Sequence, residues 1–186
     1  MLLLNIIQII LLILLGLATL YIFIFSIASL FYKQKTYADK GNMKTIAVLI
    51  PGYKEDQVIL EVAKLALEQD YSMHLFDVIV IADSFKKETL DILTTLPINL
   101  IEVSFEKSTK SKALNKAMAA LERNYDIAVV LDADNVMATD FLKKINAAFE
   151  HNFIAVQGHR TAKNTNNSWA TLDAISEEIN NNIFRK

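Results

Sequence analysis

Two acidic residues, Asp132 and Asp134, directly follow the apolar run from Ile127 to Leu131. Side chains two positions apart in an extended segment point to the same side, so both carboxylates would face one space where a strand ends. Carboxylates held close together repel unless a positive charge lies beside them. Mg²⁺ takes one or two protein carboxylates and completes its shell with water and phosphate oxygens. The pair predicts a Mg²⁺ or Mn²⁺ site for a phosphate-bearing ligand, and a solvated turn or helix cap is the alternative that the pair alone leaves open.

Other polar residues stand at the ends of apolar runs, as the acid pair does. Pro51 to Glu55 follows the first run, and Asp83 and Ser84 follow the second. In a mostly parallel sheet, ligands bind in the crevice beyond the carboxyl ends of the strands. These residues are therefore expected to lie at the same crevice as the acid pair.

The elements that would position these residues alternate along the chain. Runs rich in β-branched residues that stop at Pro, Gly or Asp are typical of strands, and apolar residues at helical spacing indicate helices. Their alternation predicts an α/β domain with a mostly parallel sheet covered by helices on both faces. Thr139 or Asp140 is expected to cap the helix that follows. The predicted strands are 46–50, 77–82, 99–103, 127–131 and 153–157, and the predicted helices are 56–69, 86–95, 110–123, 140–150 and 168–184.

The beginning of the chain has a different composition. From Leu2 to Tyr32 there is no Asp, Glu, Lys or Arg, and about 20 apolar residues suffice to cross a bilayer. The run is too long for a buried core helix or for the apolar region of a signal peptide, and no basic residue precedes it. Lys33, Lys35 and Lys40 follow it, which favours a cytoplasmic position for the rest. We interpret residues 1–32 as a transmembrane helix in the inner membrane, 33–45 as a juxtamembrane linker and 46–186 as a cytoplasmic domain.

Charge and cysteine content narrow the class of protein further. The formal net charge is −2 and the chain has no cysteine. Balanced acids and bases give no basic footprint for nucleic acid, so no nucleic-acid partner is expected. The absence of cysteine rules out a disulfide framework and is compatible with a cytoplasmic domain.

Four sequence blocks resemble, in order and in spacing, the inverting family 2 glycosyltransferases of the GT-A fold. This group includes processive, membrane-attached synthases of the cellulose and hyaluronan type. The resemblance covers about residues 44–186 and implies a Rossmann-like GT-A sheet that binds a nucleotide-sugar donor, usually a UDP-sugar, and a glycan or lipid-linked acceptor. The blocks are "VLIPGYKED" from Val48, "VIVIADSF" from Val78, "KSKALNKAM" from Lys110 and "VVLDADNV" from Val129.

The resemblance also implies roles for individual residues. Tyr53 and Glu55 would contact the nucleoside, and Asp83 would hydrogen-bond the base. Lys110 or Lys112 would face the nucleotide. Asp132 would lie on the ribose and metal side, and Asp134 would hold the metal that bridges the diphosphate. The expected substrate-binding residues are Pro51, Tyr53, Glu55, Asp83, Lys110, Lys112, Asn115 and Asp132, and the expected metal ligands are Asp132 and Asp134.

The sequence departs from the family pattern at several of these positions. Ala82 replaces the first of two acids that often end the second strand, and Ser84 and Ser111 replace usual glycines. Lys54 stands where asparagine is common. Because the principal acids are retained, we expect altered donor contacts more than lost binding.

The catalytic base cannot be assigned within the chain. In the family it is an aspartate about a hundred residues beyond the acid pair, and the printed sequence ends at Lys186. We therefore expect this chain to be the N-terminal part of a longer enzyme, without the C-terminal half of the fold and inactive alone.

Two other functions are compatible with part of the pattern. A haloacid-dehalogenase-type phosphatase also has an apolar strand that ends in Asp-x-Asp, but there the motif normally starts the domain. A truncated membrane protein that binds nucleotide and transfers nothing is the second alternative, because no base can be assigned. Phosphate release would support the first, and sugar transfer by the chain would refute the second.

Overall fold

The computed structural model describes residues 2–31, 36–162 and 167–184. The chain divides into two compact units. Residues 37–156 form one unit, which holds the sheet, and residues 1–36 with 157–186 form the other, which holds two helices.

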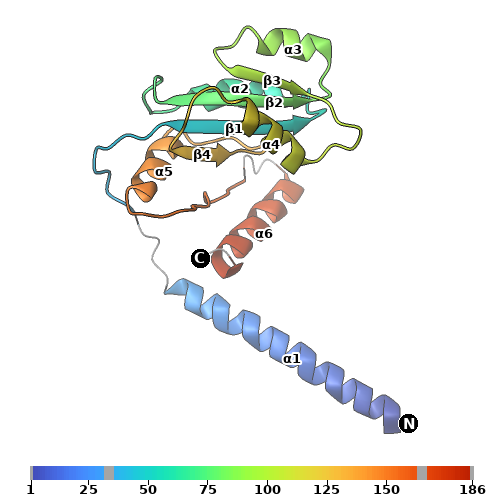
Figure 1. Cartoon of the computed structure of the whole chain (residues 1–186). Helices are drawn as coiled ribbons and strands as arrows, with labels where there is room; N and C mark the ends of the chain where they lie inside the picture. Colours follow the sequence, from blue (N-terminus) through green and yellow to red (C-terminus); the bar gives the residue numbers. More distant parts are fainter. Residues whose placement is uncertain (1, 32–35, 163–166, 185–186) are drawn as a thin grey trace. The chain divides into compact units, whose positions relative to one another are not determined.

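Four parallel strands form the sheet (Figure 1). Their order is β3-β2-β1-β4, so β1 pairs with β2 on one side and with β4 on the other. Residues 46–50 of β1 are buried, as expected for a parallel strand that is covered on both faces. The strands are β1 (Ile46–Tyr53), β2 (Phe76–Asp83), β3 (Asn99–Val103) and β4 (Ile127–Val130).

Helices cover both faces of this sheet, and alternate residues of β1 show how. Val48 and Ile50 belong to the core that includes residues of α2 (Ile59–Leu67), α3 (Lys87–Leu93) and α5 (Phe141–Phe149). Ala47 and Leu49 point the other way and pack with Ala113 and Ala117 of α4 (Lys110–Ala120). The two alanines let α4 approach the sheet closely. The predicted α/β class and the covered parallel sheet are confirmed.

Strand β1 continues through Pro51, although the sequence predicted that it would end at Ile50. Leu131 donates its backbone N–H to the carbonyl of Leu49, so Leu49 faces β4. Pro51, two residues on, turns to the same side, where β4 has already ended at Val130. The missing N–H of the proline therefore costs no ladder hydrogen bond.

The predicted strand 153–157 is wrong, because this segment has no strand structure in the described part of the chain. Ile154 is 98% exposed, and Phe153 and Val156 are exposed too. A short apolar run becomes a strand only where another strand pairs with its backbone, and the sheet described here ends at β4.

The cap predicted for α5 is correct in position and wrong in contact. Asp140 is the N-cap residue, but its side chain makes no capping hydrogen bond. Its carboxylate instead pairs with Lys144 Nζ at 2.6 Å, one turn further along. The sequence could not decide between these two contacts, because the first N–H groups of α5 and Lys144 both lie within about one turn of Asp140.

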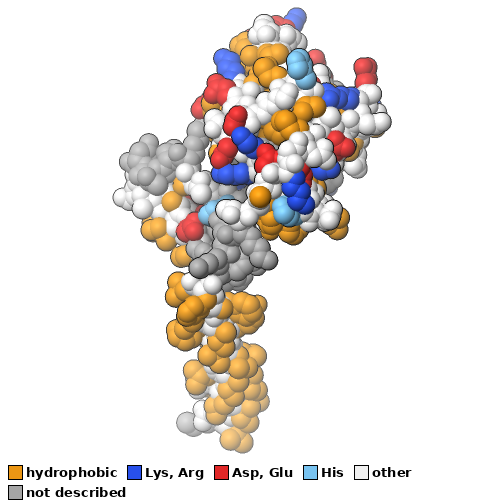
Figure 2. All heavy atoms as spheres, turned by 90° about the vertical axis from the view of Figure 1, so that its left-hand side faces the viewer, with side chains coloured by type: hydrophobic (Ala, Val, Ile, Leu, Met, Phe, Trp, Pro, Cys, Tyr) orange, Lys and Arg blue, Asp and Glu red, His pale blue; other side chains and the backbone are white. Residues whose placement is uncertain are grey.

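The other unit contains α1 (Leu2–Leu30) and α6 (Ser168–Phe184). In the described residues, α1 is the one helix long and apolar enough to cross a membrane, and no part of its most apolar stretch is buried. Figure 2 shows apolar side chains along α1, whereas acidic and basic side chains are interspersed on the face of the sheet unit that is in view. Such an exposed helix fits a membrane anchor or a signal sequence.

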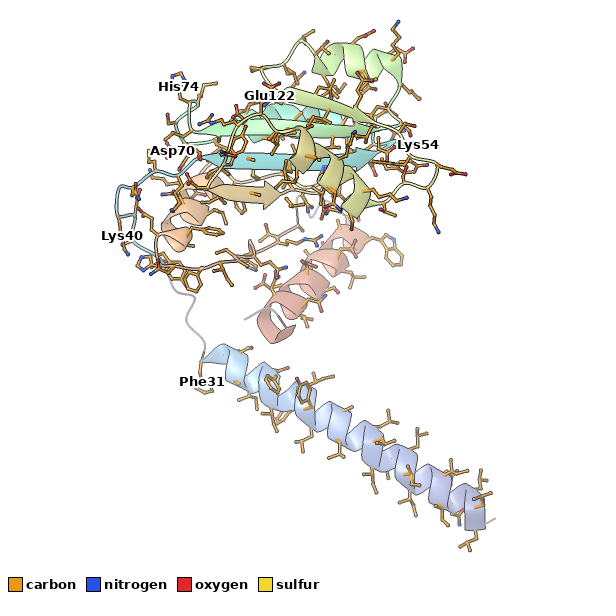
Figure 3. The ribbon with its side chains drawn as sticks, viewed as in Figure 1. Phe31, Lys40, Lys54, Asp70, His74 and Glu122 are labelled. Carbon is orange, nitrogen blue, oxygen red and sulfur yellow. The ribbon has the colours of Figure 1, made fainter. Side chains whose placement is uncertain are left out.

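Part of the segment predicted as a linker is bound to the sheet unit. The Glu150 carboxylate, just after α5, accepts hydrogen bonds from the backbone N–H groups of Lys40 at 2.7 Å and Asn42 at 2.9 Å. Asn146 Oδ1 accepts from the N–H of Lys44 at 3.0 Å. We call residues 37–45 the strap. Figure 3 shows Lys40 of the strap at the end of the sheet opposite to Lys54, which follows β1.

Candidate functional site

The loops that follow β1 and β2 lie side by side at the carboxyl end of the sheet. Tyr53 is the register partner of Asp83 across the two strands. The N–H of Lys54 donates to the Asp83 carbonyl at 3.1 Å, which extends the pairing by one step. Two of the residues that the sequence predicted for the site are thus neighbours, and Tyr53 is 51% exposed.

Both loops turn through residues with left-handed backbone conformation. Lys54 has φ 56° and Ser84 has φ 59°. For residues other than glycine this conformation costs about 1–2 kcal/mol, and asparagine and aspartate tolerate it best. These are two positions where the sequence departs from the family pattern of asparagine and glycine. The chain therefore holds strain at both strand exits.

Asp83 is held in one orientation by its neighbour. Its residue exposure is 2%, and the Ser84 hydroxyl donates to Asp83 Oδ1 at 2.9 Å. A ligand can therefore meet only an edge of this carboxylate, and Oδ2 is the oxygen that Ser84 leaves for it.

Asp56 and Phe85 fix the first loop against the second, and sequence reasoning missed both. Asp56 Oδ1 accepts from the backbone N–H of Lys86 at 2.9 Å. The pKa of the Asp56 carboxyl lies below its usual value because of hydrogen bonds from the Thr89 side chain and the Lys86 backbone. At Gly52, an added Cβ would lie 2.7 Å from Phe85 Cζ. The contacts of Asp56 and Phe85 are tertiary, and no local pattern signals them.

The structure distinguishes the two lysines at the start of α4. Lys110 Nζ contacts Asp132 Oδ1, so it faces the acid pair. Lys112 Nζ instead donates to the carbonyl of Lys107 at 2.9 Å and lies 6.0 Å from the centre of the Phe105 ring. The Thr109 hydroxyl caps the helix by accepting from the N–H of Lys112 at 3.3 Å. Of the two lysines, Lys110 is the one that the fold brings to the acid pair.

The acid pair lies in the turn just after β4. Leu131 and Ala133 are 9% and 7% exposed, whereas the Asp132 side chain is 46% exposed and Asp134 is exposed. Both carboxylates are therefore accessible to solvent, while the two apolar residues beside them are buried. Asn135 closes the turn, because its N–H donates to the Asp132 carbonyl at 3.0 Å and its Nδ2 donates to Asp132 Oδ2 at 3.4 Å.

These residues fit a divalent cation that shares its ligands with a phosphate. Within the described ranges, no cluster of three or more His, Cys, Asp or Glu side chains could hold a metal. The protein would supply the carboxylates of Asp132 and Asp134, and water and phosphate oxygens would complete the shell. Mg²⁺ is bound in this way in many phosphate-transfer sites.

The remaining predicted site residues lie in the sheet unit, and no side-chain hydrogen bond joins them to the acid pair in the described part of the chain. Pro51 is partly buried within the last residues of β1. Glu55 begins the turn into α2, where its carbonyl accepts from the N–H groups of Val58 and Ile59. Asn115 is exposed in the second turn of α4. The structure places all three in the unit that holds the acid pair and assigns none of them a ligand.

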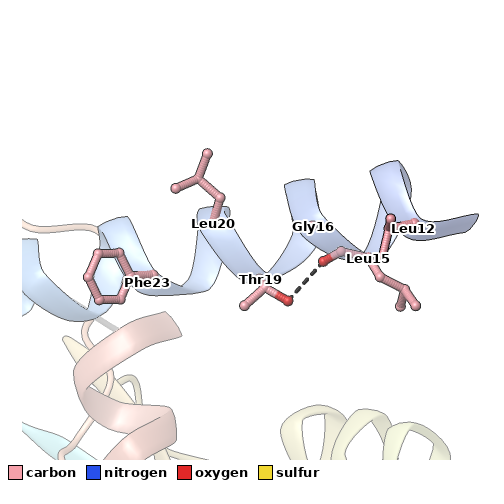
Figure 4. A pocket seen from close by; sticks show the side chains of 6 residues that line it. All are labelled: Leu12, Leu15, Gly16, Thr19, Leu20 and Phe23. Carbon is pink, nitrogen blue, oxygen red and sulfur yellow. Dashed lines mark hydrogen bonds between the residues drawn. The ribbon is translucent and has the colours of Figure 1, made fainter. Parts of the chain in front are cut away.

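A shallow groove elsewhere in the molecule has no comparable chemistry. It runs along α1 and is lined by apolar side chains and one hydroxyl, which belongs to Thr19 (Figure 4). That hydroxyl already donates to the Leu15 carbonyl at 2.8 Å. The groove is the surface of a single helix. The polar residues that could bind a ligand lie instead at the carboxyl end of the sheet. Its lining residues are Leu12, Leu15, Gly16, Thr19, Leu20 and Phe23.

Comparison with known proteins gives the family. Residues 44–184 match the model of the glycosyltransferase-like family 2. A mannosyltransferase from Pyrobaculum calidifontis, solved with GDP-Man and Mn²⁺, is 26% identical with a TM-score of 0.58, and the match covers 72% of this chain and 40% of that one. TarS of S. aureus is 22% identical with a TM-score of 0.49, over 65% of this chain and 24% of that one. No curated protein matches. The matches cover 40% or less of these two solved chains. Over residues 44–184, this chain belongs to glycosyltransferase family 2.

Proposed function

We propose that this protein is the donor-binding part of a membrane-anchored, metal-dependent, inverting glycosyltransferase that transfers a sugar from a UDP-sugar to a glycan or lipid-linked acceptor. The observation that carries the proposal is the contact between Lys110 and Asp132. It joins the positive start of α4 to the acid pair after β4, at the end of the sheet where Tyr53 and Asp83 are paired. Family membership supports the nucleotide-sugar donor.

The loops after β1 and β2 would hold the nucleoside. The exposed Tyr53 ring offers a face for stacking on a base. Asp83 Oδ2 can accept from a base N–H, while Ser84 fixes Oδ1. Glu55, on the same loop as Tyr53, can accept from a ribose hydroxyl.

The diphosphate would lie between the start of α4 and the acid pair. The first turn of α4 contains no acid, and a helix N-terminus favours anions. Lys110 would contact the phosphates, with Lys112 close by on the same turn. A divalent cation at Asp132 and Asp134 would stabilise the charge that develops on the leaving diphosphate.

The general base and the acceptor site are proposed to belong to a part of the enzyme that follows Lys186. The resemblance places the base about a hundred residues beyond the acid pair, and the matched mannosyltransferase chain is much longer than this one. Under this proposal the 186 residues bind donor and do not transfer sugar. Sugar transfer by the purified chain would overturn it.

The phosphatase alternative is overturned by the family match. The acid pair follows the fourth strand of the domain in sequence, not the first. A protein that binds nucleotide without transferring sugar stays compatible with the chain, and the same transfer assay separates it from a complete enzyme.

The membrane anchor is proposed from α1 and from the lysines after it. The helix has 29 residues and an apolar surface. Lys33, Lys35 and Lys40 favour the cytoplasmic side for the domain. Protease added to intact spheroplasts should leave the domain uncut, whereas protease added to inverted vesicles should digest it. The opposite pattern would refute this orientation.

Nucleotide titration tests the proposed binding. UDP and GDP are titrated into the full chain in detergent, with and without Mn²⁺, because the matched mannosyltransferase was solved with GDP-Man. We expect UDP to bind more tightly with Mn²⁺ and Asp134→Ala to abolish that gain. Asp70→Ala is the control, since Asp70 lies at the opposite end of the sheet (Figure 3) in an exposed pair with Lys143. Equal UDP affinity with and without Mn²⁺ would refute the metal role.

A further inference from the structure

Both oxygens of the Asp132 carboxylate already have partners within the protein. Lys110 Nζ contacts Oδ1, and Asn135 Nδ2 donates to Oδ2 at 3.4 Å. The side chains of Lys110 and Asp132 are 51% and 46% exposed, so the pair is accessible to ligands. A cation that binds Oδ1 of Asp132 would compete with the Lys110 ammonium for this oxygen.

The electrostatics at the start of α4 explain why this pair forms. The first turn carries Lys110 and Lys112 and no acid. The N-terminus of a helix is already the positive end of its dipole, so lysines there are unfavourable. Asp132 comes from the neighbouring loop and supplies the missing negative charge.

A metal ion and a diphosphate would open the same pair from opposite sides. The metal takes Asp132 away from Lys110, and a phosphate takes Lys110 away from Asp132. Whichever ligand binds first separates Lys110 from Asp132. The second ligand then binds a side chain that is no longer held in the ion pair. Two ligands that relieve the same constraint bind with positive coupling, and the coupling is reciprocal.

We propose that the Lys110–Asp132 pair is a closed ion pair that makes the binding of a divalent cation and of a nucleoside diphosphate depend on each other. The inference rests on the proposed function and adds a regulatory role for Lys110. In the absence of nucleotide, Lys110 pairs with Asp132, which is a proposed metal ligand, and the cation therefore binds weakly. With nucleotide present, Lys110 moves to phosphate and the carboxylate becomes available.

The test compares the binding of Mn²⁺ alone, UDP alone and both together, using the full chain in detergent. Mn²⁺ binding is measured by electron paramagnetic resonance of the free ion, and UDP binding by calorimetry. The variants are Lys110→Met, which removes the charge and keeps most of the length, and Lys110→Arg, which keeps the charge. Lys116→Met is the matched control, because it removes the same charge from an exposed position of the same helix and leaves the pair intact.

Lys110→Met should bind Mn²⁺ alone about two- to fivefold more tightly than the unchanged chain, as expected for the loss of one half-exposed ion pair. It should bind UDP more weakly, and the gain in UDP affinity caused by Mn²⁺ should shrink. Lys110→Arg should restore weak Mn²⁺ binding, and Lys116→Met should bind Mn²⁺ alone as the unchanged chain does.

Two results would overturn the inference in distinguishable ways. If the unchanged chain binds UDP with Mn²⁺, and Lys110→Met binds Mn²⁺ alone no more tightly than Lys116→Met does, the closed pair is refuted and the proposed function stands. If the unchanged chain binds neither UDP nor Mn²⁺, the proposed function fails and the inference fails with it.

Discussion

The two ends of the sheet are built differently. At the end that holds the strap, polar groups satisfy one another, and the left-handed position just beyond α5 is filled by Asn152, with φ 64°, a residue that tolerates it. At the carboxyl end, Lys54 and Ser84 occupy such positions, although neither is suited to them. Strained residues cluster at functional sites when the surrounding structure over-determines them. The contrast agrees with the proposal that the carboxyl end binds the ligand, whereas hydrogen bonds between polar groups hold the strap end together.

Asn146 is a buried residue with several hydrogen bonds at the strap end of the sheet. Its substitution should have the largest effect on the free energy of unfolding. It is 2% exposed and bonds the N–H of Lys44, the Tyr71 hydroxyl and the carbonyl of Asn42. Asn146→Ala should lower the free energy of unfolding by about 1–3 kcal/mol, because it leaves the part-buried N–H of Lys44 and carbonyl of Asn42 without their partner. Urea denaturation measures this, with the exposed Asn124→Ala as control. If Asn146→Ala lowers the free energy of unfolding no more than Asn124→Ala does, the strap end does not depend on these hydrogen bonds, and the contrast between the two ends of the sheet fails.

Gly52→Ala should have the next largest effect, and it acts at the carboxyl end. The added methyl would lie 2.7 Å from Phe85 Cζ, so the ring must move. We expect a loss of about 1–3 kcal/mol in the free energy of unfolding, together with weaker UDP binding, because Phe85 of the second loop contacts the chain just before the first loop. Gly16→Ala is the control, since its added methyl meets nothing within 4 Å. Full UDP affinity in Gly52→Ala would show that the loops need no fixed arrangement.

Ser84→Gly should change stability and binding in opposite directions. Glycine relieves the left-handed strain but gains freedom in the unfolded chain, so we expect a net gain of about 0.5–1 kcal/mol in thermal or urea unfolding. UDP affinity should fall, because the hydroxyl that holds Asp83 Oδ1 is lost. Asn152→Gly should do little to either quantity. If Ser84→Gly lowers both stability and affinity, strain at this position is not connected with binding.

The smallest expected effect is a dependence of stability on pH at the strap end. Hydrogen bonds from the backbone and the side chain of Thr45 lower the pKa of Asp126. A lowered folded pKa gives stability that is present above the unfolded pKa of about 3.9 and is lost as the pH falls through the folded value. Asp126→Asn should therefore flatten the fall of stability below about pH 4, measured by urea unfolding at several pH values. An unchanged slope would show that these hydrogen bonds contribute nothing to acid sensitivity.

Most of the sheet could be predicted because its signals are local. Buried strands such as Ile46–Ile50 are continuous apolar runs, and the helices between them show helical spacing of apolar residues. The strand predicted at 153–157 failed for the opposite reason. A short apolar run forms a strand only with a partner strand, and sequence periodicity does not report one.

Sequence motifs could name candidate residues for the site, but they could not predict the contacts of these residues. Motif spacing brought Asp83, Lys110 and Asp132 into consideration together, and the fold places all three at one end of the sheet unit. Spacing could not choose between Lys110 and Lys112, because the choice depends on which side chain crosses to the turn after β4. It also missed Asp56, whose partners lie 30 or more residues further along the chain.

The strap shows the same limit in a polar segment. Residues 33–45 contain charged residues and Gly41, which are typical of a linker. From Lys40 to Lys44, however, three backbone N–H groups are bonded to side chains of Glu150 and Asn146, more than 100 residues away. Composition describes what a segment prefers by itself, and the docking of the strap depends on a distant helix.

The position of Mn²⁺ in crystals grown with UDP tests the central claim most directly. Anomalous diffraction locates the ion without assumptions about the surrounding residues. We predict a peak within bonding distance of the carboxylates of Asp132 and Asp134, with Lys110 moved from Asp132 toward the diphosphate. A peak at another place, or UDP bound away from the carboxyl ends of β1, β2 and β4, would contradict this account.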